Sequence, residues 1–107
     1  MVKKVETEND MEEFLSTPMK LLIIIADNDN IVQSQLVIVS KMSSSTVQRW
    51  IEWLENKGLI EVIEAKTNVG SKKKIIRVTE KGRKIVDEIK TCLRRYYLLL
   101  KLVYTIH

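Results

Sequence analysis

The stretch that most constrains the fold is Ser34–Ile60, which predicts two short helices joined by a tight turn. Ser43 stands ahead of the second helix, where its oxygen can accept a hydrogen bond from the amides that a helix leaves unpaired in its first turn. Gly58 follows as a residue that readily takes the left-handed conformation ending a helix. The sequence therefore predicts a helix over about residues 44–56, with a core-facing side made of Val47, Trp50, Ile51 and Leu54.

The opposite side of this predicted helix is polar. Glutamine and arginine can make paired hydrogen bonds to base edges in the major groove of DNA, and serine or threonine can bond to phosphates or bases. A helix that simply faces water would carry the same kinds of side chain, so this surface alone leaves both interpretations open. The candidate major-groove residues are Ser44, Ser45, Thr46, Gln48 and Arg49.

Glu52 lies on the same side of the helix, one turn after Arg49. A carboxylate there would repel phosphates unless it orients Arg49 or accepts a hydrogen bond from a cytosine amine. The alternative for Arg49 is a surface ion pair with Glu52, which would contribute little to stability. We favour the DNA role for Arg49. Glu52 separately argues against a face that binds phosphates without discrimination.

These residues resemble the helix-turn-helix of winged-helix transcriptional regulators, the MarR-like and related prokaryotic, archaeal or archaeal-virus DNA-binding proteins. A pattern such as S-x-S-T-V-x-R-x-I-x-x-L-E-x-K-G-L-I is typical of them, and it occurs here from Ser43 to Ile60. The chain departs from the pattern at Lys41, where the turn often has glycine, and at Val37, where the preceding helix often has a small residue. A non-glycine residue in a left-handed turn costs on the order of 1 kcal/mol, so we expect a looser or differently shaped turn.

Two runs of β-forming residues follow, Leu59–Glu64 and Lys74–Val78, around a tip that contains Gly70. They predict a hairpin, which the resemblance identifies as the wing that lies on the DNA backbone or enters the minor groove. Lysines near its tip can reach phosphates and release condensed counterions; the alternative is that they only protect an edge strand from pairing with another chain. The candidate wing and backbone residues are Lys41, Lys66, Asn68, Lys72, Lys73 and Lys74.

The segment before the helix pair predicts further helices. Asn9 and Glu12 make a capping-box-like pair at the start of a short one. Pro18 suits the first turn of the next helix. That helix is apolar nearly all round, so we expect it to be deeply packed, with a core-facing stripe of Met19, Leu22, Ile23 and Ala26.

The link from this helix to the helix pair predicts a very short strand at Ile31 and Val32. Ser34 is the expected cap of a helix over Gln35–Val39. Within it, Leu36 and Val39 are expected to face the second helix of the pair.

The last part of the chain predicts one long helix, with Thr79 as its cap. The run T-E-K-G-R that starts at Thr79 also resembles the winged-helix regulators, so the resemblance extends from about Pro18 to Ile89. Apolar residues recur in steps of four and three, as in coiled-coil heptads, at Ile85, Ile89, Cys92, Tyr96, Leu99, Val103 and Ile106. A second row widens this surface beyond what one small domain can cover, at Val86, Leu93, Tyr97, Leu100 and Tyr104.

Four interpretations of this segment differ in what covers its apolar surface. A membrane span needs about 20 consecutive apolar residues, and Arg94, Arg95 and Lys101 interrupt the run, so we expect none. An amphipathic helix at a membrane surface and a helix packed wholly within its own domain are alternatives. We favour a homodimer, with candidate interface residues Ile89, Cys92, Leu93, Tyr96, Leu99, Leu100 and Val103.

Composition limits the other functions. A single cysteine excludes an intramolecular disulfide framework, and no Cys/His cluster has the spacing of a metal site. One histidine, at the C-terminal end, and no glycine-rich phosphate loop leave no nucleophile-and-base pair, so we expect neither an enzyme nor a cofactor. The first residues lack the apolar run of a signal peptide, so we expect a cytoplasmic, nucleoid-associated protein. No pocket for a small-molecule effector can be placed from the sequence.

Together these features predict a mainly α protein with a small β-hairpin (α+β), a winged helix-turn-helix with a long C-terminal dimerisation helix. We expect residues 1–8 to form a flexible arm, 9–80 the DNA-binding domain and 81–107 the dimerisation element. The expected function is that of a homodimeric transcriptional regulator, most simply a repressor, that binds double-stranded DNA sequence-specifically. A low-specificity chromatin protein and a protein-interaction adaptor are alternatives, since fold does not fix function.

Overall fold

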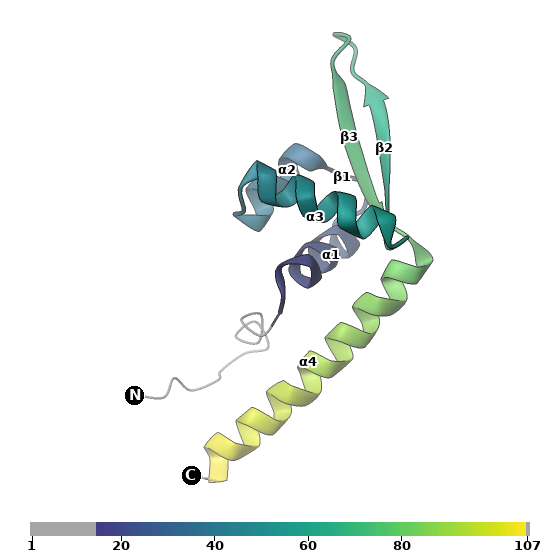
Figure 1. The fold of residues 1–107 in the computed structure, drawn as a ribbon. Helices are drawn as coiled ribbons and strands as arrows, with labels where there is room; N and C mark the ends of the chain where they lie inside the picture. The colour runs from purple at the N-terminus through teal and green to yellow at the C-terminus, as the bar shows by residue number, and fades with distance from the viewer. Residues whose placement is uncertain (1–14, 107) are drawn as a thin grey trace.

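The computed structural model describes residues 15–106, so the helix predicted at Asn9 and the predicted arm lie outside it. In chain order its elements are α1 (Thr17–Asp27), β1 (Ile31–Val32), α2 (Gln33–Ser40), α3 (Ser44–Asn56), β2 (Ile60–Lys66), β3 (Lys72–Val78) and α4 (Glu80–Ile106). Helix α1 contacts α2, α3, α4 and β3, and therefore lies at the centre. Figure 1 shows the β2–β3 hairpin extending from one end of this body and α4 from the other. The predicted winged helix-turn-helix with a long last helix is confirmed.

The turn between α2 and α3 has the left-handed geometry that glycine favours. Lys41 occupies it with φ 59° and ψ 29°, a conformation that is unfavourable for a residue with a side chain. The turn therefore keeps its usual shape, and the expected looser turn is not observed. Ser43 then caps α3, because its Oγ accepts a hydrogen bond from the Thr46 amide at 3.2 Å. Gly58, at φ 74°, follows the last residues of α3. The bounds of this helix and both of its ends are as predicted.

Helix α2 starts earlier than predicted, and Ser34 is not its cap. Val32 pairs with Ile75 as the last residue of β1, and α2 begins at the next residue. The side chain of Gln35 reaches back to accept a hydrogen bond from the Val32 amide at 3.4 Å. Ser34 therefore lies in the first turn, because strand pairing fixes the residue at which the helix can begin.

Two predictions about which side chains face the core are wrong. In α1 the fully buried residues are Leu21, Leu22 and Ile25, whereas Met19 is 37% exposed. In α2, Val39 is 52% exposed, although Leu36 is buried as expected. Periodicity cannot select the buried side of a helix that is apolar nearly all round, because every stripe along it has the same spacing.

The sheet has the order β1-β3-β2 with both pairs antiparallel. At its root, Ile31, Ile60 and Ile76 are buried and join the sheet to the core. The hairpin ladder continues outward to the pair Lys66–Lys72, so both strands run further towards the tip than predicted. Lysine is a poor β-former, but the ladder continues because the turn closes only beyond it, between Thr67 and Ser71.

A single residue, Thr79, connects β3 to α4. Its Oγ1 donates a hydrogen bond to the Gly58 carbonyl at 2.7 Å and accepts one from the Gly82 amide at 3.1 Å, so it caps α4 as predicted. A Cβ added at Gly82 would collide with the Leu59 carbonyl oxygen and lie 2.8 Å from Cγ2 of Val78. The glycine of the T-E-K-G-R run is therefore needed for a close approach of two backbones.

Helix α4 returns along α1 before it extends past the rest of the molecule (Figure 1). Val86 and Ile89 are buried, and the ammonium group of Lys90 lies 2.8 Å from Oδ1 of Asp27, at the end of α1. Further along, Tyr97 is also buried. The first turns of α4, up to about Lys90, thus pack against the body of the molecule. Within residues 15–106, no helix combines the length and apolarity needed to span a membrane.

Candidate nucleic-acid interface

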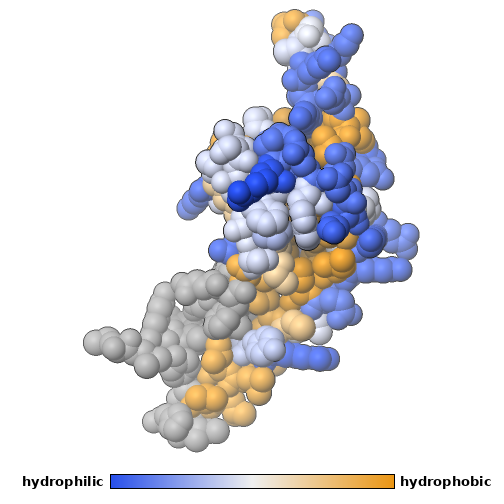
Figure 2. Space-filling model, viewed as in Figure 1, coloured by the Kyte–Doolittle hydropathy of each residue, from blue (hydrophilic) through white to orange (hydrophobic). Residues whose placement is uncertain are grey.

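The start of α3 and the tip-proximal end of strand β3 in the wing line one hollow of about 380 Å³. Ser44 contributes from α3, and Lys72, Lys73 and Lys74 contribute from β3. The remaining lining residues belong to the end of β1 and to α2: Val32, Gln33, Ser34 and Val37. Helix α3 and the wing, which the sequence predicted to contact DNA, therefore face the same side of the molecule. Figure 2 shows hydrophilic side chains gathered over the hairpin and over α3.

The outer side of α3 is polar and accessible, as predicted. Ser44, Ser45 and Arg49 are exposed, and Thr46 is half-buried with its hydroxyl 2.8 Å from Oγ of Ser43. The guanidinium carbon of Arg49 lies 5.4 Å from the centroid of the Trp50 ring. This cation–π contact supports the side chain from one face and leaves its donors directed outward. No ion pair joins Arg49 to Glu52 in the described part of the chain.

Gln48 is half-buried and its amide is held at both ends. Its oxygen accepts a hydrogen bond from Nε2 of Gln33 at 2.6 Å. Its own Nε2 donates to Oε1 of Glu52 at 2.9 Å. Glu52 therefore orients Gln48. The sequence had suggested Arg49 as its partner instead.

The tip of the wing is a tight turn that exposes lysines. Its ends are joined by hydrogen bonds from the Thr67 amide to the Ser71 carbonyl at 2.7 Å and between the two hydroxyls at 2.6 Å. Lys66 and Lys72 are paired directly opposite each other beside this turn. Like charges in that position are destabilising, and an anion that binds between them would relieve the repulsion. Among the predicted wing residues, Lys74 is half-buried and the remaining ones on the hairpin are exposed: Lys66, Asn68, Lys72 and Lys73.

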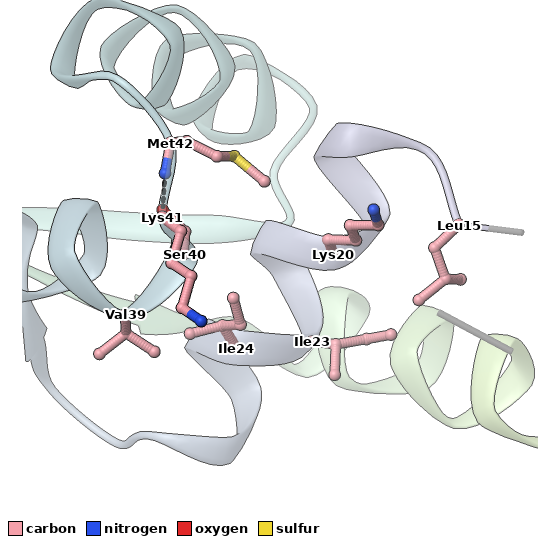
Figure 3. Close-up of a pocket in the computed structure, with 8 residues that line it drawn as sticks. All are labelled: Leu15, Lys20, Ile23, Ile24, Val39, Ser40, Lys41 and Met42. Atoms are coloured by element: carbon pink, nitrogen blue, oxygen red, sulfur yellow. Dashed lines mark hydrogen bonds between the residues drawn. The ribbon is translucent and has the colours of Figure 1, made fainter. Parts of the chain in front are cut away.

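Lys41 is not brought to the wing. It lines a separate hollow of about 360 Å³ between the α2–α3 turn and α1, together with Lys20. Figure 3 shows Lys41 and Val39 on one side of this hollow and the α1 residues Ile23 and Ile24 on the other. Its grouping with the wing lysines in a single contact surface is therefore not supported by its position.

The predicted dimer residues of α4 divide into two groups. Ile89 is buried against its own chain, and Leu93 and Leu100 are half-buried. The others are exposed: Cys92, Tyr96, Leu99 and Val103. An apolar hollow of about 440 Å³ continues this surface onto α1, lined by Leu15, Met19, Glu88, Ile89, Cys92, Leu93 and Tyr96. Hydrophobic side chains are seen along this part of α4 in Figure 2.

Residues 16–68, from the start of α1 to the tip of the wing, match the model of the MarR family. The chain belongs to the MarR family. No curated protein matches it. A MarR-family regulator from Silicibacter pomeroyi is 22% identical, with a TM-score of 0.63 over 82% of this chain and 62% of that one. A SlyA-like regulator from Listeria monocytogenes is 27% identical, with a TM-score of 0.65 over 89% of this chain and 63% of that one.

A PadR-like regulator from Bacillus cereus is similar in length as well as in fold. It is 18% identical, with a TM-score of 0.71 over 89% of this chain and 96% of that one. By contrast, the chain spans only 59% of MarR and 65% of SlyA. The MarR-family assignment thus concerns the winged helix-turn-helix, and it agrees with the expectation of a protein that is not an enzyme.

Sequence reasoning about this MarR-family chain missed Gln33. Its amide lines the hollow at the wing and reaches across to α3, but one glutamine between a short strand and a short helix has no distinctive pattern. Trp50 is half-buried, as expected for the core-facing side of α3, and Trp53 lies at the edge with the ammonium group of Lys57 5.5 Å from its ring centroid. In the described part of the chain, no three His, Cys, Asp or Glu side chains are grouped to hold a metal ion.

Proposed function

We propose that this chain is a transcriptional regulator that binds double-stranded DNA sequence-specifically as a homodimer, most simply as a repressor. Helix α3 would enter the major groove, and the β2–β3 wing would contact the backbone or the minor groove. The observation that carries the proposal is the hollow shared by Ser44 of α3 and Lys72–Lys74 of the wing. It allows one duplex to contact both elements at once.

The major-groove contacts are assigned to the accessible polar side chains of α3. Ser44 and Ser45 stand at its start, where the unpaired amides of the first turn also favour an anion such as phosphate. Arg49 follows one turn later, and it is supported by Trp50. A bidentate arginine contact to guanine is the commonest specific contact in this groove, so Arg49 is our candidate for discrimination between bases.

The wing contacts are assigned to its lysines and to Asn68 at the tip. Lysine ammonium groups bind phosphates as point charges without reading sequence. This assignment agrees with the like-charged pair of Lys66 and Lys72, whose repulsion a phosphate would reduce. Lys41 remains a separate backbone candidate at the turn between α2 and α3.

The homodimer is supported by the apolar residues that α4 leaves exposed, among them Tyr96, Leu99 and Val103. A second copy of the same helix would cover them, because the heptad spacing that places them in one row is the same in both copies. The resulting two-fold symmetry suits two half-sites about 34 Å apart on DNA. A regulator of this kind acts on chromosomal DNA, so we propose a cytoplasmic, nucleoid-associated location.

Selection of bound duplexes from a random pool tests this function directly, with Arg49→Ala compared to Arg95→Ala. Both changes remove one exposed arginine, but Arg95 lies far along α4. We expect the wild-type chain to enrich a symmetric site. At that site, Arg49→Ala should cost about 1–3 kcal/mol and lose the base preference, whereas Arg95→Ala should retain both.

Two outcomes would contradict the proposal. Equal binding of all duplexes by the wild-type chain would indicate a low-specificity chromatin protein, whose affinity depends on salt and hardly on sequence. A chain that binds no duplex at low salt would instead indicate a protein-interaction adaptor.

A further inference from the structure

Three side chains from two helices form a continuous chain of hydrogen bonds at the candidate interface. Gln33 of α2 donates to Gln48 of α3 at 2.6 Å, and Gln48 donates to Glu52 at 2.9 Å. The Gln33 amide lines the hollow that also holds the wing lysines. The chain therefore connects the start of α2 to the polar side of α3.

The direction of these hydrogen bonds is fixed by Glu52. An ionised carboxylate only accepts hydrogen bonds, so the Gln48 amide must turn its NH₂ group towards Glu52. Its oxygen then faces Gln33, which must turn its own NH₂ group towards that oxygen. As a result the Gln33 oxygen is buried and has no hydrogen-bond partner.

The unpaired Gln33 oxygen is the unfavourable consequence of this orientation. A buried polar atom without a partner is unfavourable. Rotating both amides by half a turn would give the Gln33 oxygen a donor, but it would also place the Gln48 oxygen against the carboxylate of Glu52. The charge on Glu52 therefore decides the orientation of both amides.

This orientation leaves Gln48 with one free N–H and one free acceptor position on its oxygen. An amide recognises adenine with that same pair of groups, by donating to N7 and accepting from the N6 amine. If the amide were free to rotate, it would present its donor and acceptor in either order. Gln48 thus presents its donor and its acceptor in one fixed order.

We propose that Glu52 and Gln33 are positioning residues that fix the Gln48 amide for recognition of adenine in an A·T base pair. The inference rests on the proposed DNA-binding function and deepens it. It also accounts for an acidic side chain on a surface assigned to DNA, since the carboxylate is occupied by Gln48.

The test is a matched pair of variants, Glu52→Gln and Glu55→Gln. Both remove one exposed negative charge from α3, but only Glu52 contacts Gln48. A glutamine at position 52 can donate or accept, so it no longer sets the direction of the chain. We expect Glu52→Gln to reduce the preference for adenine at one base pair of the selected site by on the order of tenfold, and Glu55→Gln to retain that preference.

Gln48→Ala and the double variant with Glu52→Gln locate the effect. If Glu52 acts through Gln48, both single changes relax the same base pair, and the double variant is no worse than Gln48→Ala. If Glu52 instead reads a cytosine itself, the two changes relax different base pairs and their effects multiply. That result would overturn the inference and leave the proposed function intact.

A measurement on the free protein separates the inference from DNA binding altogether. In NMR spectra, the NH₂ signals of Gln48 should show one proton protected from solvent exchange by the carboxylate. Glu52→Gln and Gln33→Met should each change these signals, whereas Glu55→Gln should leave them unchanged. Unchanged signals in Glu52→Gln would overturn the inference, as would a wild-type chain that selects DNA without any adenine preference dependent on Gln48.

Discussion

The molecule has two open surfaces, at opposite ends of its helical body, and they differ in the kind of side chain exposed. The surface of α3 and the wing exposes lysines, hydroxyls and a guanidinium group. The surface of α4 exposes leucines, a tyrosine and a valine along one long helix (Figure 2). Water solvates the first surface well, whereas contact with water is unfavourable for the second.

This difference shows what kind of partner each surface requires. The polar surface is stable when free and gains affinity only from a partner with negative charge, so its binding should depend on salt. The apolar surface gains from any partner that removes it from water, so its binding should depend on shape and on burial. Four predictions follow from this contrast, and the first has the largest expected effect.

The first prediction concerns a charge introduced on the apolar surface of α4. Leu99 and Leu98 are neighbours on α4 and are 57% and 58% exposed, but only Leu99 lies in the heptad row. We expect Leu99→Glu to raise the dissociation constant of the dimer by about 100-fold, because the interface would bury an unpaired carboxylate. Light scattering over a range of concentrations measures this.

Leu98→Glu is the matched control, since it makes the same change on the other side of the same helix. It should leave the dimer intact. Equal effects of the two substitutions, or a wild-type chain that is monomeric at micromolar concentration, would contradict the assignment of this surface to a second copy.

The second prediction concerns the junction between the two surfaces. In a helix with open space around it, Gly→Ala stabilises by about 1 kcal/mol. At Gly82 the added Cβ would collide with the Leu59 carbonyl and Val78, so we expect Gly82→Ala to lower the free energy of unfolding by about 2 kcal/mol. Chemical denaturation measures the change.

Gly70→Ala, at the wing tip, provides the comparison. Its φ of 83° is unfavourable for alanine, but a Cβ there has no atom within 4 Å. We expect a loss of about 1 kcal/mol from the backbone conformation alone. A Gly82→Ala variant no less stable than Gly70→Ala would show that the two backbones can separate without cost.

The third prediction sharpens the electrostatic side of the comparison. Lys73 is exposed on the wing beside the start of α3. Lys73→Ala should weaken binding to all duplexes about equally and lower the slope of log affinity against log salt by about one. Lys84→Ala removes an exposed lysine of α4 and should leave the slope unchanged. A sequence-dependent effect of Lys73→Ala would instead indicate a contact with a base.

The smallest effect is expected at Val69, an apolar residue that is 89% exposed at the wing tip. A single exposed apolar side chain is ordinary on protein surfaces, unlike the continuous row on α4. Val69→Ser should therefore change neither the dimer nor, by more than about 0.5 kcal/mol, the free energy of unfolding. A clear loss of dimer would place part of the subunit interface on the wing.

The sequence was informative where one local interaction decides the structure. The caps at Ser43 and Thr79 follow from residue type and immediate neighbours, and both are observed. The turn at Lys41 was predicted wrongly, because the lysine takes the left-handed conformation where a reshaped turn was expected. The polar side of α3 was identified in the same way, because its apolar residues occupy one narrow stripe.

Features that depend on contacts between distant segments could not be predicted. The buried side of α1 is decided by three other helices and a strand, so Met19 was wrongly assigned to the core. The start of α2 is decided by the pairing of Val32 with Ile75. The hydrogen bond from Gln33 to Gln48 joins residues 15 positions apart and needs the angle between two helices, which spacing along the chain does not contain.

One consequence follows from the single residue that joins β3 to α4. Thr79 is bonded to the end of α3, and Gly82 is pressed against the chain where β2 begins. In the described part of the chain, only Thr79 separates α4 from the wing, so no flexible linker joins α4 to the surface assigned to DNA. In a dimer, the fold itself would therefore set the distance between the two copies of α3. An operator lengthened by a few base pairs would then bind poorly, because no flexible segment could span the extra distance.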